Sequence, residues 1–188
     1  KEGKVYRRAE LAQRSAAVDR HIAQLLKEGF LEKQSAGLYY VPKQSVFGTV
    51  PPNEEALVRS FLKDDDFLVT SPNAYNSLGV GTTQLYNKRV VYNHKRHGQF
   101  KLGGRTFFFH SRHRFPKTLS KEFLLVDVVN NIKSLAEDAD VVLKNVAVQA
   151  RTVDSKKLKQ AVNNYGNLST KNFFKSLLNK NQAQVYEI

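Results

Sequence analysis

Apolar positions near the start of the chain follow a helical period. Four of them recur at the spacing of one helix face: Val18, Ile22, Leu25 and Leu26. Ser15 precedes this stripe and can cap the helix, because its hydroxyl can accept an unpaired backbone N–H. Gly29 follows it, where glycine adopts the left-handed conformation that ends a helix without a side-chain penalty. The pattern predicts one short helix with a polar opposite face.

A second helix and two strands surround that stripe. Residues 7–14 predict a helix, residues 13–15 a tight turn, and residues 30–33 and 38–41 two strands joined by a Ser-Ala-Gly turn. This order is typical of a winged helix-turn-helix, in which the second helix enters the DNA major groove. We therefore predict a winged helix-turn-helix DNA-binding domain over residues 1–48.

A Pro-, Gly-, Ser- and Thr-containing stretch, residues 43–52, predicts a linker and a second domain over residues 53–188. Its expected elements, in chain order, are a helix at 54–62, a solvated acidic loop at 64–66, a strand at 67–70 and a helix opening at 71–73. Strands follow at 84–86, 89–93, 100–102 and 105–110, with Gly103-Gly104 as a hairpin turn. For the Phe107, Phe108 and Phe109 run, core packing is favoured over a base-stacking platform.

The last third of the chain is predicted to be helical. Helices are expected at 121–136 and 155–165, and a final one begins at Ser169 or Thr170. Residues 141–148 could form a helix or a strand, because their valines lower helix propensity, and the pattern leans toward a helix. Ser120 and Asp154 are the expected caps, and residues 182–188 a loose tail. The fold class is α+β: a winged helix-turn-helix, then a mixed α/β domain with a small antiparallel sheet and C-terminal helices.

Charge points to an acidic partner. The formal net charge is +13 and the sequence pI is about 9.9. Between Asp66 and Glu122 there is no acidic residue, yet ten Lys or Arg and four His occur there. Cysteine is absent, no long apolar run or signal peptide is present, and a cytosolic protein without membrane contact is expected. Methionine is also absent, so we expect missing N-terminal residues, including a first helix.

The candidate binding residues fall into two groups. The DNA-binding set combines small residues, which let the backbone approach DNA closely, with polar residues that can reach base edges or phosphates. Its members are Ser15, Ala16, Ala17, Arg20, Gln24, Lys27, Lys33, Gln34, Tyr39 (or its neighbour Tyr40) and Lys43. The basic patch, which can contact the phosphates of DNA, comprises Lys88, Arg89, Lys95, Arg96, Lys101, Arg105, Arg112 and Arg114.

Catalysis and cofactors are not expected. The pairs His94/His97 and His110/His113 lie at strand ends, where residues three apart point to opposite faces, and no nearby acid is expected to complete a metal site. No GxSxG elbow, phosphate loop or converging acid set appears. The sequence favours binding over an enzyme.

Several stretches resemble the AbiEi family of antitoxins from bacterial type IV toxin–antitoxin, or abortive infection, systems. VYRRAEL with VDRHIAQLLKEGFLEKQSAGLYYVPK resembles the family's winged helix-turn-helix. SLGVGTTQLYNKRVVYNH with FKLGGRTFFFH resembles its antitoxin domain, and DSKKLKQAVNNYGNLSTKNFFKSLL its helical end. The likeness covers most of the chain, but lacks the helix that usually precedes VYRR.

This resemblance implies a non-catalytic cytoplasmic protein with two roles. It would bind inverted repeats in its own promoter as a transcriptional autorepressor, and would counter a nucleotidyltransferase-like toxin in phage defence, without stable complex formation being required. The antitoxin role, including toxin neutralisation as the alternative role of the basic patch, comes from the resemblance alone. The alternative is an RNA-binding accessory protein that uses the basic aromatic segment, residues 83–115.

Overall fold

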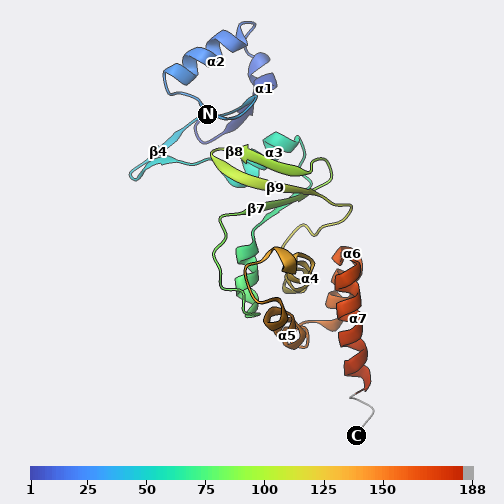
Figure 1. Ribbon diagram of the computed structural model, residues 1–188. Helices are drawn as coiled ribbons and strands as arrows, with labels where there is room; N and C mark the ends of the chain where they lie inside the picture. Colours follow the sequence, from blue (N-terminus) through green and yellow to red (C-terminus); the bar gives the residue numbers. More distant parts are fainter. Residues whose placement is uncertain (184–188) are drawn as a thin grey trace. The chain divides into compact units, whose positions relative to one another are not determined.

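A computed structural model describes residues 1–183 (Figure 1). The fold is mixed α+β, with small antiparallel sheets and C-terminal helices, as expected for its class. The chain forms two compact units. Unit 1 comprises residues 1–69 and 90–111, and unit 2 comprises residues 70–89 and the chain from 112 onward.

Unit 1 begins with a three-stranded antiparallel sheet and two helices. In chain order these elements are β1 (Val5–Arg7), α1 (Arg8–Ala12), α2 (Val18–Lys27), β2 (Glu32–Ser35) and β3 (Leu38–Tyr40). The sheet order is β1-β3-β2, with Tyr6 opposite Tyr39. Val18 and Ile22 of α2 pack with Leu31 and Tyr39 into a small apolar cluster. The predicted helices and hairpin are present, and β1 adds a third strand that pairs with β3.

Details of α2 differ from the prediction. The helix starts at Val18, with Ala17 at its N-cap and no side-chain cap, so the capping role predicted for Ser15 is wrong. Leu25 is 36% exposed, whereas Leu26 packs on the apolar cluster, so the buried stripe is narrower than predicted. Gly29 has φ +78°, and this confirms it as the residue that ends the helix.

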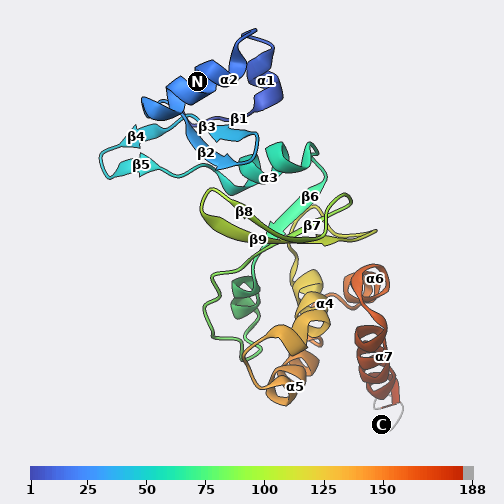
Figure 2. The ribbon, with the colours of Figure 1, turned by 45° about the horizontal axis from the view of Figure 1, so that its top comes forward.

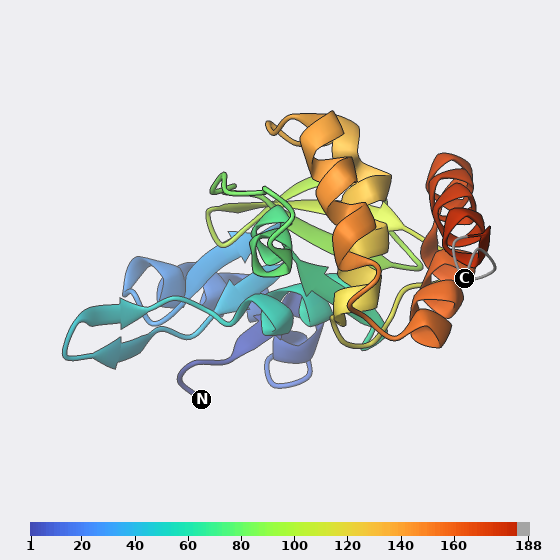
Figure 3. The same ribbon diagram turned by 90° about the horizontal axis from the view of Figure 1, so that it is seen from below.

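Residues 43–50 form a hairpin where a linker was expected. β4 (Lys43–Ser45) and β5 (Gly48–Val50) pair antiparallel, and Figures 2 and 3 show them projecting as a separate two-stranded arm. The turn uses Gly48 at φ +105°, a conformation that residues with a side chain rarely adopt. The stretch therefore has regular structure of its own.

A second sheet completes unit 1. Its elements are α3 (Glu54–Leu62), β6 (Phe67–Thr70), β7 (Arg89–Asn93), β8 (Gly98–Leu102) and β9 (Arg105–Ser111), with strand order β6-β7-β9-β8. The β8–β9 turn has Gly103 at φ +58° and Gly104 at φ +76°, which confirms the predicted hairpin. Phe107 and Phe109 are buried, so the core interpretation holds for these two rings.

The compact units divide the chain differently from the boundary predicted within residues 43–52. Leu38 of β3 shares one core with Leu57 of α3 and Phe107 of β9. Gly103 N also donates to Gln34 O at 3.0 Å, which ties β2 to the β8–β9 turn. The first 50 residues therefore pack with strands that the sequence assigned to a second domain.

Unit 2 is mainly helical. Its elements are the 3-10 helices η1 (Pro72–Leu78) and η2 (Ile132–Ser134), and the helices α4 (Lys121–Asn131), α5 (Ala139–Gln149), α6 (Ser155–Tyr165) and α7 (Leu168–Ala183). α4 packs against η1, α6 and α7, and every residue from 123 to 129 is buried. It is therefore a central helix rather than an amphipathic one.

Most of the helix starts in unit 2 agree with the sequence, but α4 ends at Asn131 and the 3-10 helix η2 follows, where one helix was predicted to reach residue 136. Ser120 caps α4 through Phe123 N, and Asp154 caps α6 through two backbone N–H groups. The lean toward a helix at 141–148 is confirmed by α5. α7 begins one residue before the expected Ser169, with Asn167 Oδ1 accepting from Thr170 N. Residues 182 and 183 end α7, and the rest of the predicted tail lies outside the described residues.

Residues 83–88 contain no strand, which corrects the predicted strand at 84–86. Instead, Tyr86 Oη donates to Glu137 Oε2 at 2.6 Å and accepts from Ala136 N at 2.7 Å. Burial, and then the bond to Glu137, raise the pKa of Tyr86. Side-chain anchoring therefore fixes this loop in place of sheet pairing.

A buried carboxylate joins α4 to η1. Asp127 is 3% exposed and accepts from Tyr75 Oη at 2.7 Å and from Asn131 Nδ2 at 3.2 Å. A buried charge is costly unless hydrogen bonds compensate it. The Tyr75 hydroxyl is therefore expected to stabilise unit 2.

We expect Tyr75→Phe to lower the free energy of unfolding by about 1.5–3 kcal/mol, because a hydrogen bond to a buried charged group is lost. Chemical denaturation measures this. The matched control is Tyr165→Phe, since the Tyr165 hydroxyl has no hydrogen bond within the described residues. Equal destabilisation by both changes would contradict the role assigned to Tyr75.

Candidate nucleic-acid interface

One face of α2 is exposed and carries the predicted reading residues. Arg20, Gln24 and Lys27 are exposed and lie at i, i+4 and i+7, which places them along one side of the helix. Gln24 Nε2 donates to Glu28 Oε1 at 2.9 Å. Within residues 1–183 no carboxylate pairs with Arg20 or Lys27. These two cations therefore face solvent.

The N-terminal end of this face is only partly open. Ala16 is exposed and Ala17 is half-buried. Ser15 Oγ accepts from Ala17 N at 3.2 Å and lies 2.8 Å from His21 Nδ1. Ser15 therefore shapes the turn into α2 and holds the His21 ring, instead of capping the helix.

A bidentate ion pair joins α1 to α2. Arg8 Nε and Nη2 donate to the Asp19 carboxylate at 2.7 and 2.6 Å. The hydrogen bond from Arg8 lowers the pKa of the Asp19 carboxyl below its ordinary 3.8. The pair therefore stabilises the fold above that ordinary pKa, and the contribution is lost as pH falls through the lowered value.

The hairpin after α2 offers fewer contacts than predicted. Lys33 and Lys43 are exposed, as a phosphate contact requires. Gln34 is 8% exposed and Tyr39 is 9% exposed, so their side chains present little surface for the predicted DNA contacts. Gln34 packs against the Gly103 turn and Tyr39 packs on α2. Tyr40 is also buried, and its hydroxyl donates to Val50 O.

The tip of the β4–β5 hairpin was not anticipated. Val46 and Phe47 are 93% and 98% exposed. Ser45 Oγ donates to Gly48 O at 2.8 Å and accepts from Phe47 N, which fixes the turn. The hairpin therefore presents two apolar side chains on an ordered loop. The only sequence signal was apolar residues between Ser45 and Gly48.

The predicted basic patch is divided between the two units. Four members lie in unit 1, namely Lys95, Arg96, Lys101 and Arg105, and four lie in unit 2, namely Lys88, Arg89, Arg112 and Arg114. Lys95 pairs with Asp64 and Arg105 with Glu54, so two are offset by acids from outside the acid-free segment. Lys101 is exposed.

The remaining members differ in exposure. Lys88 and Arg89 are half-buried, and Arg112 is exposed. Arg114 Nη1 donates to Asn164 Oδ1 at 3.1 Å, which ties it to α6. The eight residues are therefore not equivalent phosphate contacts.

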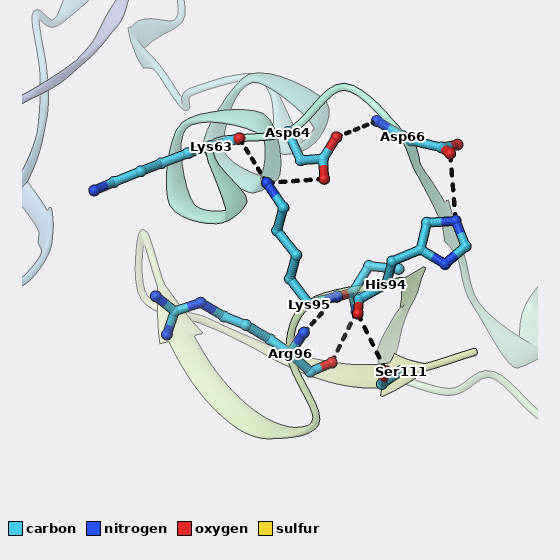
Figure 4. Close-up of polar contacts among 8 residues, drawn as sticks. Lys63, Asp64, Asp66, His94, Lys95, Arg96 and Ser111 are labelled. Atoms are coloured by element: carbon cyan, nitrogen blue, oxygen red, sulfur yellow. Dashed lines mark hydrogen bonds and ion pairs between the residues drawn. The ribbon is translucent and has the colours of Figure 1, made fainter. Parts of the chain in front are cut away.

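The acidic loop meets the basic segment (Figure 4). Asp64 pairs with Lys95 at 2.9 Å, and Asp66 Oδ2 lies 3.3 Å from His94 Nε2. Asp65 pairs with Arg59 at 2.6 Å. The expectation that no acid lies near the histidines is wrong for His94, because the chain returns β7 beside this loop.

The histidines do not gather into a metal centre. The His97 and His110 rings contact edge to face at 5.6 Å between centroids, although they belong to different sequence pairs. Within residues 1–183, no three His, Cys, Asp or Glu side chains are grouped to hold a metal ion. Across the same residues, no helix is long and apolar enough to cross a membrane.

Comparisons with family models, curated proteins and solved structures gave no match.

We expect the Asp19 carboxyl to titrate below 3.8 in the folded chain, and Arg8→Gln to return it toward that value. Side-chain NMR titration measures both. Asp64 is the internal control, since a backbone N–H from Asp66, and then Lys95, lower its pKa independently of Arg8. An Asp19 midpoint that Arg8→Gln leaves unchanged would contradict the bidentate pair.

Proposed function

We propose that this protein is a DNA-binding transcriptional autorepressor that also serves as an antitoxin of the AbiEi type. In this proposal β1, α1, α2 and the β2–β3 hairpin act as a winged helix-turn-helix. α2 enters the major groove, and the hairpin lies beside the phosphate backbone.

The exposed face of α2 carries the proposal. Arg and Gln can bond purine edges bidentately, whereas Lys mainly contacts phosphate. Arg20 and Gln24 are placed for the first role and Lys27 for the second. The Arg8–Asp19 pair supports this, because it fixes α2 against α1 without using the reading residues.

The antitoxin half has different support. It follows from the resemblance of residues 77–94 and 100–110 to the AbiEi antitoxin domain, and no contact within the chain identifies a toxin surface. The expected partner is a nucleotidyltransferase-like toxin, countered in the bacterial cytoplasm with or without direct contact. In this proposal, DNA recognition and toxin neutralisation use different residues and can be tested separately.

The RNA-binding alternative has less support. It requires aromatic rings of residues 83–115 as a platform for unstacked bases. Phe107 and Phe109 are 0% and 1% exposed, and Phe100 contacts Phe61 and Phe109 in the core. These rings are occupied by packing, which favours DNA binding through α2.

We expect Arg20→Ala to weaken binding to the chain's own promoter by about 1–3 kcal/mol and to reduce discrimination against scrambled DNA. The cause is loss of a bidentate contact to a base. Fluorescence anisotropy on both duplexes at physiological salt measures it.

The matched control is Arg151→Ala, since Arg151 is also exposed but lies in unit 2, in the turn that follows α5. Arg151→Ala should change the affinities for promoter DNA and for scrambled DNA slightly and to the same extent. Equal affinity of the unmodified protein for promoter and scrambled DNA would rule out sequence-specific repression.

We expect a nucleotidyltransferase gene beside this one, whose expression alone arrests growth and whose co-expression with this chain restores it. Arg20→Ala should retain neutralisation, because it alters only DNA reading. Growth curves under separate inducers measure both. Arrest that persists beside abundant folded protein would refute the antitoxin half.

A further inference from the structure

A cavity of about 360 Å³ opens in unit 1, between the start of α1, the β2–β3 turn, the end of α3 and the β7–β8 turn. Four cationic residues line it: Arg7, Arg8, Lys63 and Arg96. None of its lining residues is acidic. Phe61 and Leu38 supply apolar wall. The cavity thus combines concentrated positive charge with an apolar surface.

Two of the four cations are already paired. Arg7 bonds Glu10 at 3.2 Å, and Arg8 bonds Asp19. Within the described residues, Lys63 and Arg96 have no carboxylate partner. Both lie in the same region of Figure 4, and no dashed line reaches the Lys63 ammonium or the Arg96 guanidinium. These two groups retain unused N–H donors.

The adjacent aspartates do not neutralise this pair. Three aspartates directly follow Lys63, but each lies against another side chain. Asp64 pairs with Lys95, Asp65 pairs with Arg59, and Asp66 lies next to His94. Lys63 leaves the end of α3 in the left-handed conformation, at φ +54°. This conformation starts the turn that separates Lys63 from the acidic run.

Arg96 is held in position before any ligand binds. Its guanidinium carbon lies 4.5 Å from the Phe61 ring centroid and 5.8 Å from that of Phe100. A guanidinium stacked on aromatic rings loses little freedom when it binds, and its planar donors match the oxygens of a phosphate. The wall also contains Ser35 Oγ, which is buried without a hydrogen-bond partner in the described chain.

We propose that this cavity binds a phosphate group through Arg96 and Lys63. Carboxylates are weaker candidates, since a phosphate carries more charge and more acceptor oxygens for the surplus donors. The volume is within the range of small-molecule sites, and the apolar wall suits a nucleoside. A mononucleotide and a DNA backbone phosphate share this chemistry. The proposal does not depend on the function proposed above.

The test uses the full chain and three probes: AMP, inorganic pyrophosphate and a scrambled DNA duplex. Isothermal titration with the two small probes should show saturable binding that Lys63→Gln and Arg96→Gln each weaken about tenfold or more. If only the DNA duplex binds, the cavity holds a phosphate of the DNA backbone. Each variant should then reduce the salt dependence of the DNA affinity by about one released counterion.

The control is Lys4→Gln, since Lys4 is exposed in the same unit, lies outside the cavity and belongs to neither candidate binding set. It should leave AMP and pyrophosphate binding unchanged. Circular dichroism checks that each variant is folded, and Lys63→Gln removes no core contact. No binding of the small probes, together with an unchanged salt dependence in both cavity variants, would overturn the proposal. Promoter recognition by α2 would survive that result.

Discussion

The hydrophobic core around α3 is the interaction on which unit 1 depends. Leu57, Val58 and Leu62 of α3 are buried against Leu38 of β3 and against Phe107 and Phe109 of β9. The buried residues of α3 contact strands of both sheets, so the three-stranded and the four-stranded sheet share one core. Helix α2 and the strands β7, β8 and β9 therefore belong to the same compact unit.

This arrangement also determines how charge is distributed. The β-hairpins return cationic side chains to the acids that precede them, so Lys95 and Arg105 meet Asp64 and Glu54. Among the described residues, the cations without a carboxylate partner include Arg20 and Lys27 on α2, and Lys63 and Arg96 at the cavity. The net charge of +13 indicates an acidic partner. Which cations can contact that partner depends on which of them already form ion pairs within the chain.

Local features of the fold were predictable from sequence. Gly29, Ser120 and Asp154 act within one helical turn of their own position, and Gly103-Gly104 needs only its own dihedral angles. The long helices follow from periodic apolar residues in the same way. The exposed residues of α2 could be identified because they lie opposite that periodic face.

Features that depend on distant partners were not predictable. Gln34 is buried because Gly103 packs on it from almost seventy residues away, and Tyr39 because β1 and α2 cover it. Residues 84–86 have strand-forming composition, yet Tyr86 bonds Glu137 instead of a neighbouring strand. Residues from four separate segments line the cavity, so no single sequence motif could predict it.

The central claim is that α2 reads base edges in the major groove. The most direct measurement is the affinity for promoter DNA in which 7-deazapurines replace the purines, which removes the N7 acceptors and keeps base pairing. Bidentate reading by Arg20 or Gln24 predicts weakening by about 1–3 kcal/mol for each lost base contact. Unchanged affinity for the substituted promoter would contradict the assignment of α2 as the reading helix.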